Sequence, residues 1–204
     1  MSYSRVNPEK RRERQRKSLV ASTIQLLVII LLSVGLSQVI NAFILTSFHI
    51  PSESMNNTLE VNDRIMVNKL VPTVLALHRG DVVVFEDPSN WLPDSDKPNG
   101  EGYLVKRVIA IGGDTISCCD NEGRILVNGE PIDEPYIQPG DVPSEIEFDE
   151  KVPEGYVWVM GDNRDNSKDS RFQGDSESGK FVPLESIVGK AFAVMWPVNH
   201  WTFI

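Results

Sequence analysis

One uncharged segment near the N-terminus constrains this chain more than any other feature. Residues 18–48 contain no Asp, Glu, Lys or Arg, and most of them are apolar. A helix of this length can cross the hydrocarbon core of a bilayer, which is about 30 Å thick. A cleavable secretory signal has an apolar core of only about 7–15 residues and ends at a small-x-small site. Because Asn41-Ala42-Phe43 lacks the small residue that such a site needs, we predict a transmembrane anchor at residues 18–46.

Charge is distributed unevenly about this segment. Residues 1–17 carry seven Lys/Arg and two Glu, a net charge of +5, so the chain's total of −9 leaves −14 for the remainder. The positive-inside rule then predicts that residues 1–17 form a basic cytoplasmic tail, with the rest on the extracytoplasmic side of the cell membrane. An acidic domain repels phosphate backbones, and no basic stripe with interleaved aromatics follows residue 17, so nucleic-acid binding is not expected.

Beyond the anchor the pattern changes to short β-type runs separated by turn residues, without a convincing helical period. The polar, Pro-containing stretches 88–102 and 138–152 are predicted to be long loops. We therefore expect a mostly β catalytic domain of short antiparallel strands over residues 47–204. The predicted strands are 64–70, 81–85, 103–111, 114–116, 124–127, 156–160 and 189–195.

The cysteines and tryptophans leave alternatives open. Cys118 and Cys119 are adjacent, and neighbouring Cβ directions usually do not suit a disulfide, so two thiols are favoured over an oxidised pair. No second Cys or His cluster completes a tetrahedral site, so we expect no metal. Trp91, Trp196 and Trp201 suit either the lipid headgroup layer or an ordinary core or loop position.

Two short segments carry candidate chemistry. Ser52 and Ser54 directly follow the apolar run, in the sequence Pro-Ser-Glu-Ser-Met. In the predicted strand 103–111, Leu104, Lys106, Val108 and Ala110 share one face, which surrounds the lysine with apolar side chains. Burial there would lower the pKa of the lysine and make it a base. The alternative is that the lysine reaches solvent at a sheet edge.

A third segment, Met160-Gly161-Asp162-Asn163-Arg164 through Asp169-Ser170-Arg171, is dense in turn formers and charges. By composition it could be a solvated loop. Its acids alternate with arginines, however, and it follows a strong strand, which favours an ordered and internally paired loop.

These three segments, together with Arg79-Gly80-Asp81-Val82-Val83 and Lys106-Arg107 followed by Gly112 and Asp114, resemble the bacterial type I signal peptidases. The resemblance runs from the anchor through residue 171, and more weakly to the C-terminus. It implies a membrane-bound serine endopeptidase that removes N-terminal signal peptides from exported preproteins. Signal peptides and the lipid bilayer are the implied partners, and no cofactor is implied.

The resemblance also implies roles for individual residues. Ser54 would be the nucleophile and Lys106 the general base, with the oxyanion held by the Ser54 N–H and the Ser52 hydroxyl. Ser167 would orient the lysine. A charge pair, Asp169 and Arg171, would brace the site together with Arg164.

Substrate selection would follow from shallow apolar pockets that accept small side chains, the Ala-x-Ala rule. The matching positions hold Ile50, Met55, Leu104 and Val105. One departure is visible, because many family members have proline two residues after the methionine, where this chain has Asn57. The change could loosen the turn after Ser54 but removes no reacting group.

Other classes of protein remain as alternatives. A histidine-dependent hydrolase would use His49, His78 or His200, but none lies at a recognisable spacing from a partner acid. A self-cleaving Ser-Lys protease of the repressor type shares the dyad chemistry, but the membrane span and the lack of a DNA-binding domain count against it. A membrane-anchored β-rich binding module would need neither Ser54 nor Lys106.

Overall fold

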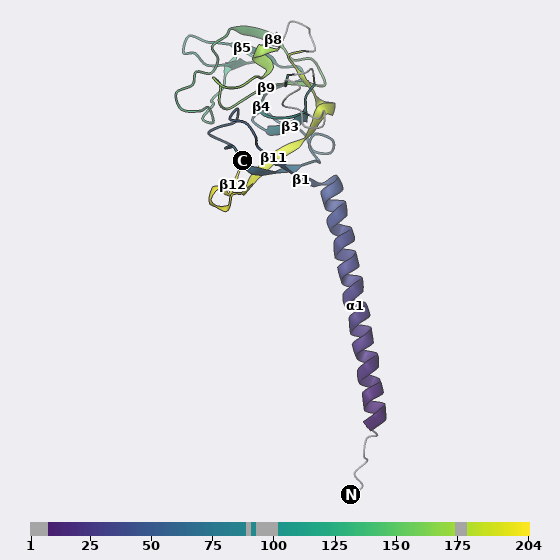
Figure 1. The fold of residues 1–204 in the computed structure, drawn as a ribbon. Coiled ribbons are helices and arrows are strands. Elements are labelled where there is room, and N and C mark those ends of the chain that lie inside the picture. The colour runs from purple at the N-terminus through teal and green to yellow at the C-terminus, as the bar shows by residue number, and fades with distance from the viewer. Residues whose placement is uncertain (1–7, 89–90, 93–101, 174–178) are drawn as a thin grey trace. The chain divides into compact units, whose positions relative to one another are not determined.

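The apolar segment forms one long helix, α1 (Pro8–Phe43) (Figure 1). Within it, Leu19–Phe43 is 25 residues long and apolar enough to cross a membrane, and its most apolar part is not buried inside the protein. At 1.5 Å per residue this stretch is about 38 Å long, which exceeds the bilayer core. The helix therefore matches the predicted anchor by length and composition.

The computed structural model describes residues 8–88, 91–92, 102–173 and 179–204, with side chains described from residue 19. The chain divides into two units, Met1–Phe43 and Ile44–Ile204. The second unit is mostly antiparallel β-sheet, which confirms the predicted fold class.

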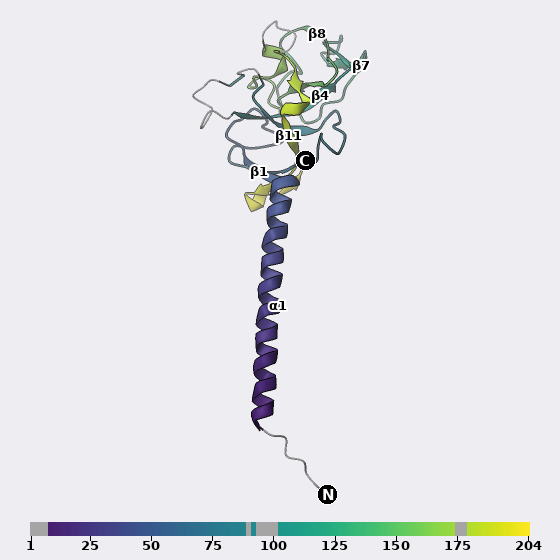
Figure 2. The same ribbon diagram turned by 90° about the vertical axis from the view of Figure 1, so that its right-hand side faces the viewer.

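Within the described residues, the strands of the second unit form two sheets. The larger has the order β1-β2-β11-β3-β4-β9-β10 with β12 paired to β11, and the smaller has the order β7-β6-β5-β8. Figure 2 shows β1 and β8 at opposite ends of this unit. The larger sheet contains β1 (Leu45–His49), β2 (Arg64–Asn68), β3 (Val82–Glu86), β4 (Tyr103–Ile111), β9 (Tyr156–Met160), β10 (Val182–Pro183), β11 (Ile187–Trp196) and β12 (Thr202–Phe203). The smaller contains β5 (Thr115–Cys118), β6 (Leu126–Val127), β7 (Glu130–Pro131) and β8 (Phe148–Lys151). Among the described residues, short 3-10 helices are η3 (Ser170–Phe172), η4 (Leu184–Ser186) and η5 (Val198–His200).

The turn between β1 and β2 is held by the core on both sides of Ser54. Ile50, Met55 and Leu59 are at most 2% exposed and pack in one apolar cluster with residues of β2, β3 and β11. The main chain adds two hydrogen bonds, from Ile50 N to Asp63 O at 2.9 Å and from Asn62 N to Ile50 O at 2.9 Å. The nucleophile candidate therefore lies on a turn that both packing and backbone bonding fix in place.

A bulge in β4 changes which residues share a strand face with Lys106. The register of β4 against β9 shifts between Val108 and Ala110. Leu104 and Val108 pack in one cluster, whereas Ala110 packs with Ile109 in another. The expectation that all four alternate residues share one face is therefore wrong at Ala110, because a bulge adds one residue to the strand and breaks the alternation.

Two predicted boundaries also differ from the structure. The helix ends at Phe43, before the expected anchor end at residue 46, because β1 starts at Leu45 and pairs with β2. Inside the predicted loop 138–152, β8 pairs with β5 and Phe148 packs against Trp158, with ring centroids 5.0 Å apart. Most of the predicted loop 88–102 lies outside the described residues.

The structure places the cysteines and tryptophans for which the sequence leaves alternatives open. Cys118 and Cys119 form a disulfide with each other, so the favoured pair of thiols is wrong. Trp91 is a core residue, 4% exposed, whose Nε1 donates to Gly179 O at 3.0 Å. Trp196 and Trp201 remain more than half exposed.

Candidate active site

Ser54 and Lys106 lie 52 residues apart in the sequence and meet in the structure. The Lys106 Nζ donates a hydrogen bond to Ser54 Oγ at 2.6 Å and another to Val105 O at 3.1 Å. Both side chains are buried, with residue exposures of 9% for Ser54 and 4% for Lys106. The middle of β4 supplies the lysine, and the turn after β1 supplies the serine.

Burial is the main cause of the lowered pKa of Lys106. It lowers the pKa of Lys106 from 10.5 to about 8, while the carboxylates of Asp169 and Asp162 oppose the shift and Arg171 adds to it. A pKa unit corresponds to about 1.4 kcal/mol, so keeping the folded protein's lysine charged costs roughly 3 kcal/mol. That penalty is fully present below about pH 8 and disappears above the pKa of the unfolded chain, near 10.5. An amine with such a pKa can act as a base near neutral pH.

Two hydrogen-bond donors belong to the turn that carries Ser54. The Ser52 hydroxyl is 3.4 Å from Ser54 Oγ and belongs to an exposed residue. Within the described parts of the chain, the Ser54 N–H donates to no acceptor. Hydroxyl and backbone N–H groups of this kind can donate hydrogen bonds to a carbonyl oxygen.

The loop after β9 packs directly against the backbone of the serine turn. Asn163 N donates to Ser54 O at 3.2 Å, and Asn163 Nδ2 donates to Glu53 O at 3.1 Å. A Cβ at Gly161 would overlap Ser54 O and the Ser167 side chain. The close approach of the two backbones therefore requires glycine at position 161.

A buried ion pair joins this loop to β4. Arg107 donates from Nε to Asp162 Oδ1 at 2.8 Å and from Nη2 to Asp162 Oδ2 at 2.6 Å. Thr58, four residues after Ser54, also donates to Asp162. Asp162 is 0% exposed, so its charge needs these partners. One carboxylate thus links the neighbour of Lys106 to the serine turn.

Asp169, the acid of the predicted charge pair, accepts hydrogen bonds from a main-chain N–H as well as from Arg171. Arg171 donates from Nε and Nη2 to the two oxygens of Asp169, each at 2.9 Å. Asp169 Oδ2 also accepts from Gly161 N at 3.0 Å. Arg171 Nη2 donates to the carbonyl oxygen of Arg164 at 2.8 Å. The Arg164 guanidinium pairs with Glu134 at 2.6 Å.

Ser167 does not make the contact expected of it. The residue is 6% exposed, and its hydroxyl has no hydrogen-bond partner among the described residues. The lysine instead uses Ser54 Oγ and Val105 O as acceptors. The expected hydrogen bond from Ser167 to Lys106 is thus not formed in this structure.

The predicted substrate-pocket residues fall into two neighbouring apolar clusters. Ile50 and Met55 are buried in one cluster, and Val105 packs against it while remaining partly exposed. Leu104 is buried in the other cluster. The structure therefore brings three of the four together and places Leu104 apart.

Several residues of the site were not predicted. The motifs contain Arg107, Asp162 and Asn163 without indicating a role for each of them, although the alternation of acids with arginines indicates internal pairing. No sequence pattern indicates a role for Glu134, because its contact with Arg164 joins two loops at positions 30 residues apart. Within the described residues, no group of three or more His, Cys, Asp or Glu is placed to hold a metal ion.

Comparison with known proteins decides the family. A family model described as signal peptidase, peptidase S26, matches residues 22–196. The chain belongs to this signal peptidase family. As a member it is a hydrolase, a serine peptidase that removes signal peptides, and the resemblance to type I signal peptidases is confirmed.

Relatives of this signal peptidase cover most of its length. It is 35% identical to a probable signal peptidase I of Mycobacterium leprae, over 85% of this chain and 76% of that protein. It is 41% identical to the signal peptidase I of Leptolyngbya laminosa, over 83% of this chain and 77% of that protein. A solved signal peptidase I of Enterococcus faecalis is 24% identical, with a TM-score of 0.38 over 56% of this chain and 95% of that one, a weak likeness.

Proposed function

We propose that this signal peptidase cleaves exported preproteins after an Ala-x-Ala type site, with Ser54 as nucleophile and Lys106 as general base. The observation that carries the proposal is the 2.6 Å hydrogen bond between the buried Lys106 Nζ and Ser54 Oγ. Neutral Lys106 takes the hydroxyl proton as Ser54 Oγ attacks the scissile carbonyl, and returns it to the leaving amine. Water then attacks the acyl-enzyme ester with the same lysine as base.

The developing oxyanion is stabilised by the Ser54 N–H and the Ser52 hydroxyl. The Ser54 N–H has no acceptor in the described structure, and the Ser52 Oγ lies 3.4 Å from the nucleophile. A donor in this role typically contributes about 3–4 kcal/mol in the transition state. Ser167 lies close to Gly161, and in this proposal its hydroxyl, which has no hydrogen-bond partner among the described residues, orients the lysine.

The residues before the cut bind beside Val105, at the edge of the cluster that contains Ile50 and Met55, whereas Leu104 lies in the other cluster. All four are apolar, and Val105 stays partly exposed at the edge of its cluster. Such a surface suits small side chains at the first and third positions before the cut.

The anchor fixes the enzyme in the cell membrane with its N-terminus in the cytoplasm. Seven Lys/Arg among residues 1–17, and none in residues 18–48, support this orientation. The catalytic unit, Ile44–Ile204, then meets signal peptides on the extracytoplasmic side, where they emerge from the bilayer.

A cleavage assay on a preprotein with an Ala-x-Ala site, using the detergent-solubilised full chain, tests the proposal. Ser54→Ala and Lys106→Ala should each lower kcat by at least about 10³-fold. His49→Ala and Lys180→Ala should leave it within about twofold. Lys180 is a matched control because it pairs with Glu150 rather than with the serine. An inactive wild type would favour a binding module, and loss with His49→Ala alone would contradict the lysine base.

A further inference from the structure

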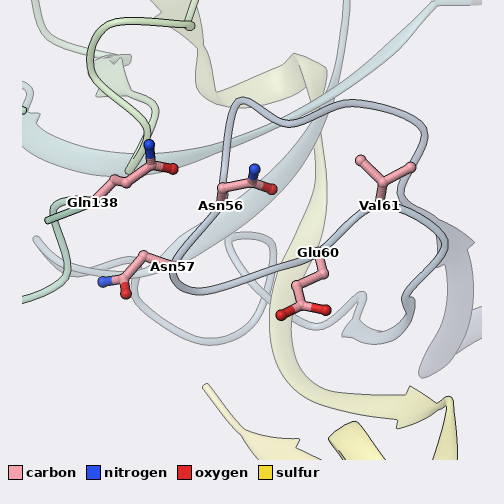
Figure 3. A pocket seen from close by; sticks show the side chains of 5 residues that line it. All are labelled: Asn56, Asn57, Glu60, Val61 and Gln138. Atoms are coloured by element: carbon pink, nitrogen blue, oxygen red, sulfur yellow. The ribbon is translucent and has the colours of Figure 1, made fainter.

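Segment 134–143 lies in the connection between β7 and β8 of the smaller sheet, yet it bonds to the turn that carries the nucleophile. Asn57, in that turn, donates from Nδ2 to Tyr136 O at 3.0 Å and to Ile137 O at 3.3 Å. Figure 3 shows Asn57 and Gln138 where the two stretches of chain line one hollow. The segment is therefore tied to the serine turn.

The same segment is tied to the loop after β9. Gln138 N donates to the carbonyl oxygen of Asp162 at 2.9 Å. Arg164, which is 2% exposed, donates from Nη2 to Glu134 Oε1 at 2.6 Å and from Nη1 to Pro143 O at 2.7 Å. Because a buried guanidinium needs acceptors of this kind, the loop and the segment hold each other in place.

Tyr136 adds a contact with the strand that carries the lysine. The centre of its ring lies 4.0 Å from Cζ of Arg107, the residue after Lys106, and a guanidinium over an aromatic face is attracted electrostatically to the ring. The Tyr136 hydroxyl donates to Glu134 Oε1 at 3.0 Å, which orients the ring. Arg107 in turn holds Asp162 through two hydrogen bonds. Tyr136 thus contacts the framework of β4 with its ring and the serine turn with its carbonyl oxygen.

These contacts surround the reacting pair without involving its atoms. Ser54 Oγ and Lys106 Nζ meet at 2.6 Å from two separate pieces of the chain, so their distance depends on how those pieces are held. A misplacement of about 1 Å at a reacting group can cost about 10²-fold in rate. We propose that Tyr136 is a positioning residue, which keeps the serine turn and β4 at the spacing that the hydrogen bond between Ser54 and Lys106 needs.

The inference rests on the proposed function, and its test uses the same cleavage assay with the full chain. Tyr136→Leu should lower kcat by about tenfold and leave KM within about twofold, because the ring on Arg107 is lost while the apolar surface for the substrate is unchanged. Tyr136→Phe keeps a ring over Arg107 and should retain kcat within about twofold of the wild type.

Tyr156→Leu is the matched control for the loss of a tyrosine ring. Tyr136 and Tyr156 are both partly buried and pack against the same apolar cluster, but Tyr156 lies in β9 and pairs with β10. Thermal unfolding should show a loss of stability in both leucine variants. Measured well below its Tm, kcat of Tyr156→Leu should stay within about twofold of the wild type.

Asn57→Gly tests the same link without removing a buried ring, so the test does not depend on the folding of Tyr136→Leu. Glycine keeps the left-handed backbone of Asn57, whose φ is 81°, and removes both side-chain bonds to segment 134–143. Its kcat should fall about threefold with KM unchanged. Asn62→Gly makes the same change at another left-handed residue of this turn, with a φ of 76°, keeps the main-chain bond to Ile50 O, and should leave kcat as in the wild type.

Equal kcat in Tyr136→Leu and Tyr156→Leu, a change in KM alone, or a Tyr136→Phe variant as slow as Tyr136→Leu would overturn the inference. An Asn57→Gly variant with the kcat of Asn62→Gly would also overturn it. In each of these cases, cleavage that still depends on Ser54 leaves the proposed function intact. Failure of the wild type to cleave any preprotein, or cleavage that survives Ser54→Ala, would overturn the proposed function and this inference together.

Discussion

The charges around Lys106 are balanced in a way that leaves its amine available. Asp169 and Asp162 both act to keep the lysine protonated. Each of these carboxylates is paired through two hydrogen bonds with an arginine, Arg171 and Arg107 respectively. Burial outweighs the attraction of the two carboxylates, and Arg171 adds to its effect, so the pKa of Lys106 falls to about 8. The paired acids therefore link parts of the site while the pKa of Lys106 stays lowered.

Gly161 offers a test of how tightly this site is packed. We predict that Gly161→Ala destabilises the catalytic unit by about 1–3 kcal/mol, because the added methyl group overlaps Ser54 O and Ser167. The displaced serine should also lower kcat by about 10²-fold. Thermal unfolding and the cleavage assay measure the two effects. Gly35→Ala is the control, since a Cβ at Gly35 meets nothing within 4 Å; equal effects of the two substitutions would contradict the packing argument.

At the scale of elements, the turn between β1 and β2 differs from the family's usual sequence for a structural reason. Asn57 has a φ of 81°, in the left-handed region. Proline is confined to a φ near −65°, so it cannot occupy this conformation, whereas asparagine tolerates it. The asparagine side chain also bonds to Tyr136 O and Ile137 O. In this structure Asn57 therefore ties the turn to residues 136 and 137.

Replacing Asn57 by the proline that many family members have should therefore destabilise this protein. We predict that Asn57→Pro lowers the free energy of unfolding by more than about 1 kcal/mol and reduces cleavage, because φ must change and both side-chain hydrogen bonds are lost. Asn57→Gly keeps the left-handed backbone and should retain more stability than Asn57→Pro. Thermal unfolding of the two variants side by side decides the matter, and a fully stable proline variant would show that the turn does not need a positive φ.

The elements divide into those that local pattern could predict and those that it could not. Tyr103–Ile111 and Tyr156–Met160 were predicted with the observed bounds, because apolar runs flanked by turn residues are a local signal. The strand Phe148–Lys151 was missed, since two of its residues are exposed and its acidic side chains resemble a loop. The bulge before Ala110 depends on the partner strand and leaves no mark in the sequence.

At the site, too, local motifs indicate residues, whereas contacts between distant segments cannot be predicted from the sequence. Family motifs pointed to Ser54 and Lys106, and the structure brings the two side chains together. The pairing of Arg164 with Glu134 could not be predicted, because two loops distant in sequence must first fold against each other.

At the scale of the whole molecule, the catalytic unit carries its own exposed aromatic residues. Trp196, Trp201 and Phe203, at the end of β11 and around β12, are 57%, 58% and 69% exposed. Trp201 and Phe203 stack edge-on, with ring centroids 5.1 Å apart. Exposed clusters of this kind mark surfaces for membranes or partners, and tryptophan favours the headgroup layer.

Tryptophan quenching tests whether this surface meets lipid. We predict that brominated lipids quench the fluorescence of the full chain in vesicles, and that the double variant Trp196→Phe with Trp201→Phe loses most of this quenching. Trp91 and Trp158 are 4% and 1% exposed and should remain unquenched. Quenching that is absent, or that is unchanged in the double variant, would show that these aromatic residues do not contact the bilayer.

The pH dependence of cleavage tests the lysine base most directly. For a preprotein with an Ala-x-Ala site, kcat/KM should rise with pH and level off above an apparent pKa near 8, because only the neutral Lys106 can accept the Ser54 proton. Below that pH the lysine is protonated and activity should fall about tenfold per pH unit. A rising limb near pH 6.5 that disappears in His49→Ala, or a profile without any rising limb between pH 6 and 10, would contradict the Ser54–Lys106 mechanism.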